Sequence, residues 1–464
     1  MDGLNELTRE QLTAQVLDLR ETVQTQAAQI AEMRQTIQQQ AEHISQLEDE
    51  ISRLSGPKPK PGWVKPNAQK AEKRPRKRRR GSHSRSRLIA NRIDIHVMER
   101  CPDCGRALCG GAVKWRHQVI EIPVVQVEVT DHLFMERRCG VCGKRWTPDA
   151  KVILGDVVMG KRTIGIRLMS TIAYLKTVCR APIGLIRRLL KAFYGVKLSV
   201  GEITELLHAV AQAGESAYAG LADRVRGSPV VHGDETGWRE DGVNGYLWSF
   251  STPEVRCYTY NQSRGSAVVQ SVLSDSFSGV LVSDFYGAYN IYDGFKQRCW
   301  VHLKRDLEAL TANHSDKPAV VDWVNSVLGV YYRAKEVSQR NCSEEERTRL
   351  RLGFETALQR LVDPYVKDKL APQRVLAKRI DRFMGELFTF VQYPEAPSEN
   401  NAAERAIRPA VIARKVSGGT RSSKGSNTMS VLRSLFETWT LQGCNCIQAC
   451  GEMIIQYNTA HAAS

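Results

Sequence analysis

The clearest hydrophobic pattern in the 464-residue chain is a seven-residue repeat near its N-terminus. Apolar side chains recur at two positions of the repeat, four residues apart, and only Gln26 and Gln40 interrupt them. One position holds Leu12, Leu19, Met33, Leu47 and Leu54, and the other holds Val16, Val23, Ile30, Ile37, Ile44 and Ile51. β-Branched residues at one position and leucine at the other favour a parallel two-stranded coil. We therefore predict a coiled coil over residues 1–55 and a homodimer or higher oligomer, with a lone amphipathic helix as the alternative.

A helical pattern runs through residues 160–225, inside a predicted helical region of residues 151–226. A basic amphipathic helix is expected from Pro182 to Tyr194, and Gly195 supplies a turn. Ser199 and Glu202 have the spacing of a capping box at the start of a second helix. This is the layout of a helix-turn-helix. Generic helical packing fits equally well, because no residue of the second helix stands out as a base reader.

From Pro229 onward the pattern changes to that of strands. Strands are predicted at 230–234, 246–250, 255–260, 280–284 and 298–301, with a helix at 265–273. Three meander strands, a helix and further strands match the order of the RNase H-like fold. Long helices then interrupt the pattern. The predicted catalytic domain is thus divided into residues 227–304 and 393–443, around a helical insertion at 305–392 and before a C-terminal tail at 444–464.

Two of the predicted strands end on an aspartate, Asp234 and Asp284, where each strand should leave its sheet. Carboxylates on neighbouring strand ends suit hard divalent cations, which take oxygen ligands. Glu404 is a third candidate. The alternative is that strand-end aspartates only cap turns.

Two Cys-x-x-Cys-Gly motifs lie within a predicted module of residues 99–150. They contain Cys101, Cys104, Cys139 and Cys142, and Gln118–Val129 between them alternates like a strand. Four such thiolates make a closed tetrahedral Zn²⁺ site, so the module is predicted to be a zinc ribbon or a related finger. The spacer is long, and Cys109, His117 and His132 are alternative ligands; paired redox cysteines are the main alternative to zinc.

The net charge of +16 is unevenly distributed. Residues 1–55 hold ten acidic and four basic residues, whereas residues 56–87 hold thirteen basic residues and one acidic one. The predicted linker of residues 56–98 is rich in proline and contains a basic arm that would bind phosphates. This arm includes Arg74, Arg76, Lys77, Arg78, Arg79 and Arg80. A solvated tail without a partner is the alternative. Neither a run of 18 apolar residues nor a secretory leader is found, so a cytoplasmic, nucleoid-associated protein is expected.

With Asp234, Asp284 and Glu404 together, the chain resembles the transposases of the insertion-sequence 66 family of bacterial mobile elements. The resemblance covers about residues 10–440 and rests on several signatures. These are His232–Trp238, Ser283–Tyr289, Asn400–Pro409, the Cys299-Trp-Val-His302 spacing and the basic, glycine-rich Arg414–Gly425. In two places the chain departs from the family: Glu399 stands where aspartate is commoner, and residues 443–450 differ from the usual C-terminal pattern.

The resemblance implies a multidomain DDE transposase that cleaves element ends and transfers the freed strand to target DNA, with possible accessory proteins. Two Mg²⁺ or Mn²⁺ ions would serve the reaction. Asp234 would bridge them, with Asp284 on one ion and Glu404 on the other. Supporting roles are expected for His302, Asn401 and Arg408, and DNA contacts for Arg414, Lys415, Arg421 and Lys424. A core histidine is the alternative for His302, and solvated surface is the alternative for each basic residue.

The third acid has two candidates, because Glu399 and Glu404 lie five residues apart and would face different directions on one helix. Ser398 is expected to be the N-cap, which places Glu399 in the first turn as a capping residue. Catalysis is therefore assigned to Glu404. The competing function is that of a catalytically silent DNA-binding or regulatory relative that uses only the zipper, the arm and the zinc module.

Overall fold

The structure is a computed structural model that describes residues 25–26, 29, 33, 35–36, 39–40, 87–122 and 125–462. The described residues between 25 and 40 are helical. The rest of the predicted coiled coil and the arm Lys73–Arg80 lie outside the described residues. The chain divides into two units, Met1–Ile120 and Glu121–Ser464. Among the described residues, no helix has the length and apolar character needed to cross a membrane.

The first unit contains one of the two cysteine turns. The Cys101 amide donates to the Arg106 carbonyl at 2.8 Å, and the Gly105 amide donates back to the Cys101 carbonyl at 2.9 Å. Gly105 has a φ of +72°, in the left-handed region that glycine adopts most easily. The first Cys-x-x-Cys-Gly therefore forms a closed turn, as the motif predicted.

The second cysteine turn lies in the second unit and has the same backbone pattern. The Cys139 amide donates to the Lys144 carbonyl at 2.8 Å, and the Gly143 amide donates to the Cys139 carbonyl at 3.0 Å. Strands β1 (Arg137–Arg138) and β2 (Arg145–Trp146) flank this turn as an antiparallel pair. The strand predicted over Gln118–Val129 is wrong for the residues described there. They are extended but pair with no other strand, and a strand needs a partner for its backbone groups.

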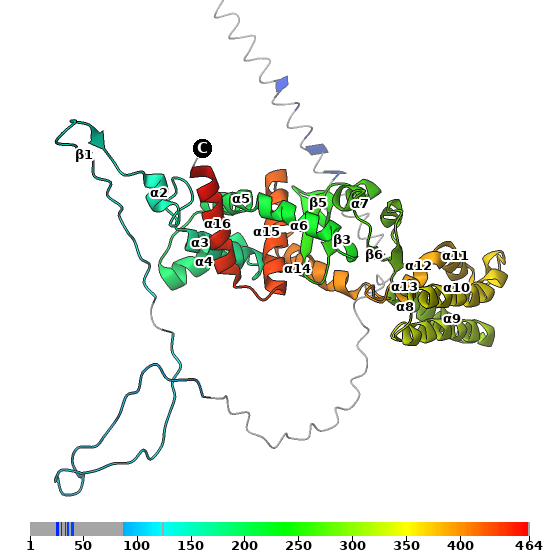
Figure 1. The fold of residues 1–464 in the computed structure, drawn as a ribbon, viewed down its shortest axis with the longest axis horizontal. Helices are drawn as coiled ribbons and strands as arrows, with labels where there is room; N and C mark the ends of the chain where they lie inside the picture. Colours follow the sequence, from blue (N-terminus) through cyan, green and yellow to red (C-terminus); the bar gives the residue numbers. More distant parts are fainter. Residues whose placement is uncertain are drawn as a thin grey trace, which may run out of the picture. The chain divides into compact units, whose positions relative to one another are not determined.

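Helices fill the region before the main sheet (Figure 1). They are α2 (Ala150–Leu154), α3 (Ile166–Thr177), α4 (Ile183–Tyr194), α5 (Val200–Ala213) and α6 (Glu215–Arg226). The predicted turn and capping box are both present: Gly195 ends α4 with a φ of 70°, and Ser199 and Glu202 cap α5 reciprocally. Helix α5 packs against α3, α4, α15 (Ser423–Leu441) and α16 (Cys446–Ala462). Its largely buried surface matches generic packing better than a base-reading helix.

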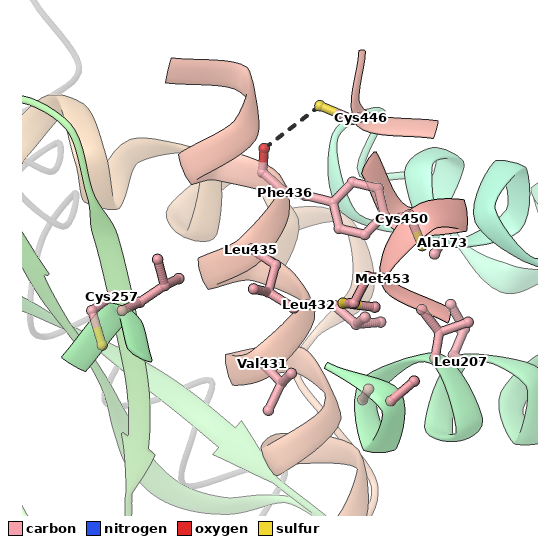
Figure 2. Close-up of a cluster of buried hydrophobic side chains, with 14 of the residues drawn as sticks. Ala173, Leu207, Cys257, Val431, Leu432, Leu435, Phe436, Cys446, Cys450 and Met453 are labelled. Atoms are coloured by element: carbon pink, nitrogen blue, oxygen red, sulfur yellow. Dashed lines mark hydrogen bonds between the residues drawn. The ribbon is translucent and has the colours of Figure 1, made fainter. Parts of the chain in front are cut away.

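The C-terminal segment is a helix of the core and not the tail that was predicted for residues 444–464. Helix α16 packs on α3, and Figure 2 shows Cys450 beside Ala173 of α3 and Met453 beside Leu432 of α15. Cys446 and Cys450 are buried, whereas Cys444 is exposed. Buried thiols behave as small hydrophobic side chains, and the two cysteines help α16 to complete the helical layer.

The main sheet has five strands in the order β5-β4-β3-β6-β7. They are β3 (Val230–Glu240), β4 (Val243–Ser251), β5 (Arg256–Asn261), β6 (Val280–Ser283) and β7 (Lys296–Arg298), with α7 (Ser266–Leu273) between β5 and β6. The first three strands form an antiparallel meander, and β3, β6 and β7 are parallel. The α/β class and the predicted order of elements are therefore present.

Two boundaries differ from the prediction. Strand β3 continues to Glu240 instead of ending at Asp234, because β4 pairs with it over its whole length from His232. The strand predicted at 298–301 lies earlier, at Lys296–Arg298, because Trp300 already begins a helix whose apolar face is buried.

The short helix η1 (Gly287–Ile291) lies between β6 and β7. A helical insertion with its own core follows β7. It comprises α8 (Trp300–Asn313), α9 (Pro318–Val337), α10 (Glu344–Val366), α11 (Arg374–Arg382), α12 (Met384–Leu387) and α13 (Thr389–Gln392). At the centre of this core Trp300 stacks on Tyr331, and its ring meets that of Phe388 at a tilt of 49°. Helices α12 and α13 contact β7, which joins the insertion to the edge of the sheet (Figure 1). The chain then enters α14 (Asn401–Ser417), which packs on β3 and β4.

Candidate active site

The two predicted aspartates lie at the point where the parallel part of the sheet stops. Strand β3 pairs with β6 only as far as His232 opposite Val282, so Asp234 lies just beyond the end of that pairing. Asp284 follows the last residue of β6. Each carboxylate accepts a backbone amide hydrogen bond at 2.9 Å, Asp234 from Glu235 and Asp284 from Tyr286. Local hydrogen bonds therefore orient both side chains.

Helix α14 begins two residues later than its sequence predicted. Its N-cap is Asn400, and Glu404 lies in its first turn, where the helix dipole favours a carboxylate. Ser398 is therefore not the cap: its carbonyl accepts the Trp300 amide, and its hydroxyl contacts Tyr331. Glu399 lies before the helix, and its carboxylate is 3.8 Å from Lys335 Nζ of the insertion.

The electrostatics of Asp234 connect the three acids. The pKa of Asp234 is raised to about 7, first by burial, then by the Glu235 carboxylate, and further by the charges of Asp284 and Glu404. The amide of Glu235 opposes the shift by stabilising the charged form. Asp234, Asp284 and Glu404 are thus near enough to interact. In the described ranges, however, no three His, Cys, Asp or Glu side chains are grouped closely enough to hold a metal ion as they stand.

His302, on the first turn of α8, faces the third acid. Its Nε2 lies 3.8 Å from Glu404 Oε1, and its Nδ1 is buried without a hydrogen-bond partner. The neighbouring Cys299 thiol raises the pKa of His302 most; the Asp284 and Glu404 carboxylates raise it as well, and partial burial opposes them. The Asp284 and Glu404 carboxylates thus stabilise the protonated form of His302, the form that can donate to phosphate oxygens.

Asn400 links the helix of the third acid to the strand of the first, a role that sequence reasoning missed. Its amide nitrogen donates to the Gly233 carbonyl at 2.8 Å, and its amide oxygen lies 3.0 Å from His232 Nδ1. Its backbone amide donates to Cys299 Sγ at 3.1 Å. Asn400 and His232 are both buried. The side chain that could have capped α14 instead sets the position of Glu404 relative to Asp234.

Comparison with known proteins adds to this geometry. The model of a family described as "Transposase IS66 family" matches residues 161–428, more than half of the chain, including all three acids.

The chain belongs to the IS66 family of transposases. It is also similar to two uncharacterized proteins of Sinorhizobium fredii (strain NBRC 101917 / NGR234). The protein y4jO is 28% identical over 174 residues, which cover 38% of this chain and 51% of y4jO. The protein y4jD is 24% identical over 287 residues, which cover 54% of this chain and 55% of y4jD. The chain thus spans about half the length of the curated relatives it matches.

In this IS66-family protein, a buried carboxylate next to Asp234 also escaped sequence reasoning. The Glu235 side chain is 3% exposed, and its oxygens accept from Arg264 Nη2 and the Tyr289 hydroxyl, both at 2.6 Å. Arg264 lies over the Tyr286 ring at 4.0 Å. The only sequence signal was its position: Glu235 adjoins Asp234 in a strand, so it must point to the opposite face of the sheet.

The predicted DNA contacts have different surroundings. The Arg414 guanidinium donates to Thr236 and to the Gly237 carbonyl, so it ties α14 to β3. Lys424 pairs with Glu205 at 3.4 Å. Lys415, Arg408 and Arg421 are exposed, and Asn401 is half-buried.

The glycine-rich part of the Arg414–Gly425 segment is docked on β3. The Thr420 amide donates to the Arg239 carbonyl at 2.9 Å, and the Asp241 amide donates to the Thr420 carbonyl at 2.9 Å. The buried Glu240 accepts hydrogen bonds from Ser423 and Ser426 of the same segment. These contacts hold the segment at the end of the strand that carries Asp234.

The first cysteine of each zinc-module turn has a thiol poised for ionisation. Backbone amides of Asp103 and Cys104 lower the pKa of Cys101, and amides of Cys142 and Val141 lower that of Cys139. Thiolates are the form that binds metal.

Proposed function

We propose that this protein is the DNA transposase of a bacterial insertion sequence, which cleaves element ends and joins them to target DNA. The observation that carries the proposal is the placement of Asp234 in β3, Asp284 at the end of β6 and Glu404 in the first turn of α14, with the charges of Asp284 and Glu404 both acting on the pKa of Asp234. We interpret the sheet as RNase H-like, because its strand order and directions match the arrangement expected for that fold. Membership of the family supports the same reaction class.

The three acids suit divalent cations on the chemistry of their donors. Carboxylate oxygens are the ligands that Mg²⁺ prefers. Burial is the largest cause of the raised pKa of Asp234, and the charges of Asp284 and Glu404 contribute to it, so a bound cation would relieve their repulsion. When bound there, Mg²⁺ or Mn²⁺ would stabilise the charge on the attacking and leaving oxygens of a phosphodiester. A small movement of α14 or of the acid side chains would be needed to bring the oxygens into ligating positions.

The chain's own residues would hold and orient the DNA. His302, whose pKa is raised by Cys299 and by the nearby acids, would donate a hydrogen bond to a phosphate oxygen beside Glu404. Asn400 keeps α14 in register with β3, so that the acids stay aligned during strand cleavage and during attack of the freed 3′ hydroxyl on target DNA. The basic arm would bind phosphates without regard to sequence.

We also propose that Cys101, Cys104, Cys139 and Cys142 bind one Zn²⁺ ion. The matching backbone patterns of the two turns and their lowered cysteine pKa values support this assignment. Purified protein should contain about one zinc per chain. Replacing Cys101 by serine should lower that content, whereas Cys179→Ser should not. Equal zinc in both variants would count against the four-cysteine site.

Glu404→Gln and Glu399→Gln provide the direct test of the active site. Glu404→Gln should abolish Mg²⁺-dependent cleavage of a labelled element end and leave DNA binding intact, because only a metal-ligating charge is lost. Glu399→Gln should still cleave, since Glu399 pairs with Lys335. If Glu399→Gln is the inactive variant, the assignment is wrong. A wild-type protein that shifts the DNA but never cuts it would be a silent binder.

A further inference from the structure

A cavity of about 580 Å³ opens beside Asp284, between the sheet and the helical insertion. Its walls include Asp284, Phe285 and Tyr286 from the end of β6 and Lys378, Arg382 and Phe383 from the end of α11. A cavity of this size is typical of a site for a small molecule. It can accommodate one or two nucleotides but not a duplex.

The positive charge of this cavity is only partly neutralised. Arg379 pairs with Asp306, and Arg264 pairs with Glu235, so these two cations already have carboxylate partners. Lys378 and Arg382 are exposed, and neither takes part in an ion pair of the described residues. They are four residues apart on α11, so they lie on one face of the helix. Two cations are therefore available to a ligand.

The aromatic walls are held in place by the paired arginines. Arg379 lies over the Phe285 ring at 5.4 Å, and the Phe285 and Phe383 rings meet edge to face at 5.4 Å. Cations that follow a phosphate backbone, combined with aromatic side chains beside the bases, form the usual surface for a single nucleic-acid strand. Since Asp284 is itself part of the wall, a ligand here would be continuous with DNA at the acids.

We propose that this cavity binds an unpaired nucleotide of the DNA strand next to the scissile phosphate, with Lys378 and Arg382 on the backbone phosphates. The proposal rests on the proposed function, because it takes the acids as the place of cleavage. It gives the helical insertion a role in the reaction: α11 would hold the reacting strand apart from its complement.

The test is a photo-cross-link on the full chain without divalent cations. The probe is a short oligothymidylate carrying one 4-thiothymidine, and mass spectrometry locates the linked residue. The wild-type protein should link at Phe285, Tyr286 or Phe383, and a blunt duplex of the same length should not. Lys378→Gln combined with Arg382→Gln should remove most of these links. It should also make the salt dependence of strand binding shallower by about 1.4 logarithmic units per logarithmic unit of salt, or about 0.7 for each phosphate contact.

The control is Arg349→Gln combined with Arg360→Gln, which removes two exposed cations of α10 that do not line the cavity. It should keep the wild-type links. Four outcomes would each overturn the proposal. The cross-links could be confined to the basic arm, they could be unaffected by the α11 changes, they could form equally with the duplex, or free thymidine monophosphate could compete for them completely. Because the assay needs no cleavage, a wild-type protein that links as expected but never cuts would refute the proposed function alone.

Discussion

The contact between Asn400 and β3 makes a sharp test of how the acids are aligned. Asn400→Ala removes two side-chain hydrogen bonds, at 2.8 Å to the Gly233 carbonyl and at 3.0 Å to His232 Nδ1. Both partners remain buried, because His232 is 6% exposed and Gly233 is buried as well. The change therefore leaves two polar groups in the interior without partners.

The expected cost follows from this burial. An unsatisfied buried polar group costs about 1–3 kcal/mol, so the variant should lose about 3 kcal/mol of unfolding free energy. With an unfolding entropy of about 2.1 cal/mol/K per residue, a loss of that size over the unit Glu121–Ser464 corresponds to a fall in Tm of roughly 4 °C. A displacement of α14 by about 1 Å would also misplace Glu404 relative to Asp234 and could slow cleavage by about 10²-fold.

The matched control is Asn401→Ala, which removes the neighbouring asparagine, a half-buried residue on the first turn of the same helix. It should cost less than about 1 kcal/mol, since surface substitutions away from special features usually change stability little. Thermal unfolding measures stability, and cleavage is compared at a temperature where all variants are folded. Equal melting temperatures for the two variants would refute the buried contact. A lower Tm with unchanged cleavage would show that the contact stabilises the fold but does not align the acids.

Three further outcomes are expected. Because Asp234 has a folded pKa of about 7 against an ordinary value of 3.8, the folded state holds an extra proton between these values and loses stability as pH rises through them. Mg²⁺ should therefore raise Tm more at pH 8 than at pH 6, and Asp234→Asn should remove this pH dependence; an equal Mg²⁺ effect at both pH values would contradict it. Glu235→Gln should lower the unfolding free energy measured in urea by about 1–3 kcal/mol, because the hydrogen bonds that Arg264 and Tyr289 donate to the charged carboxylate are weakened. A variant more stable than the wild type would disprove this. Gly419→Ala should destabilise the docked segment, since Gly419 has a φ of +131° and a Cβ there would lie 2.1 Å from the Arg239 carbonyl oxygen. Gly184→Ala should not destabilise the protein, because open space surrounds that position. Similar melting curves for the two variants would refute the predicted strain at Gly419.

Local patterns were enough to predict the local elements. The apolar runs at Val230 and Val280 predicted two strands that the structure contains, and the Ser199–Glu202 spacing predicted a reciprocal cap. Both cysteine motifs gave closed turns with a left-handed glycine. Each of these features depends on residues within a few positions of one another, so the chain encodes it in a short window.

Long-range contacts decided the site. The sequence placed Ser398 at the start of a helix, but packing against Trp300 and Tyr331 uses its polar groups, so the helix begins later and Glu404 occupies the first turn. The sequence predicted that Arg414 contacts DNA at the surface. In the structure its guanidinium donates hydrogen bonds to Thr236 and to the Gly237 carbonyl of β3.

The central link, from Asn400 to His232, joins residues that are 168 positions apart. The residues around Asn400 and those around His232 give no indication that these two side chains will be in contact. The types of the acids and the strands that carry two of them could be predicted from short patterns. Their alignment could not, because it depends on which buried polar groups find partners when α14 packs on the sheet, and only the folded chain settles that.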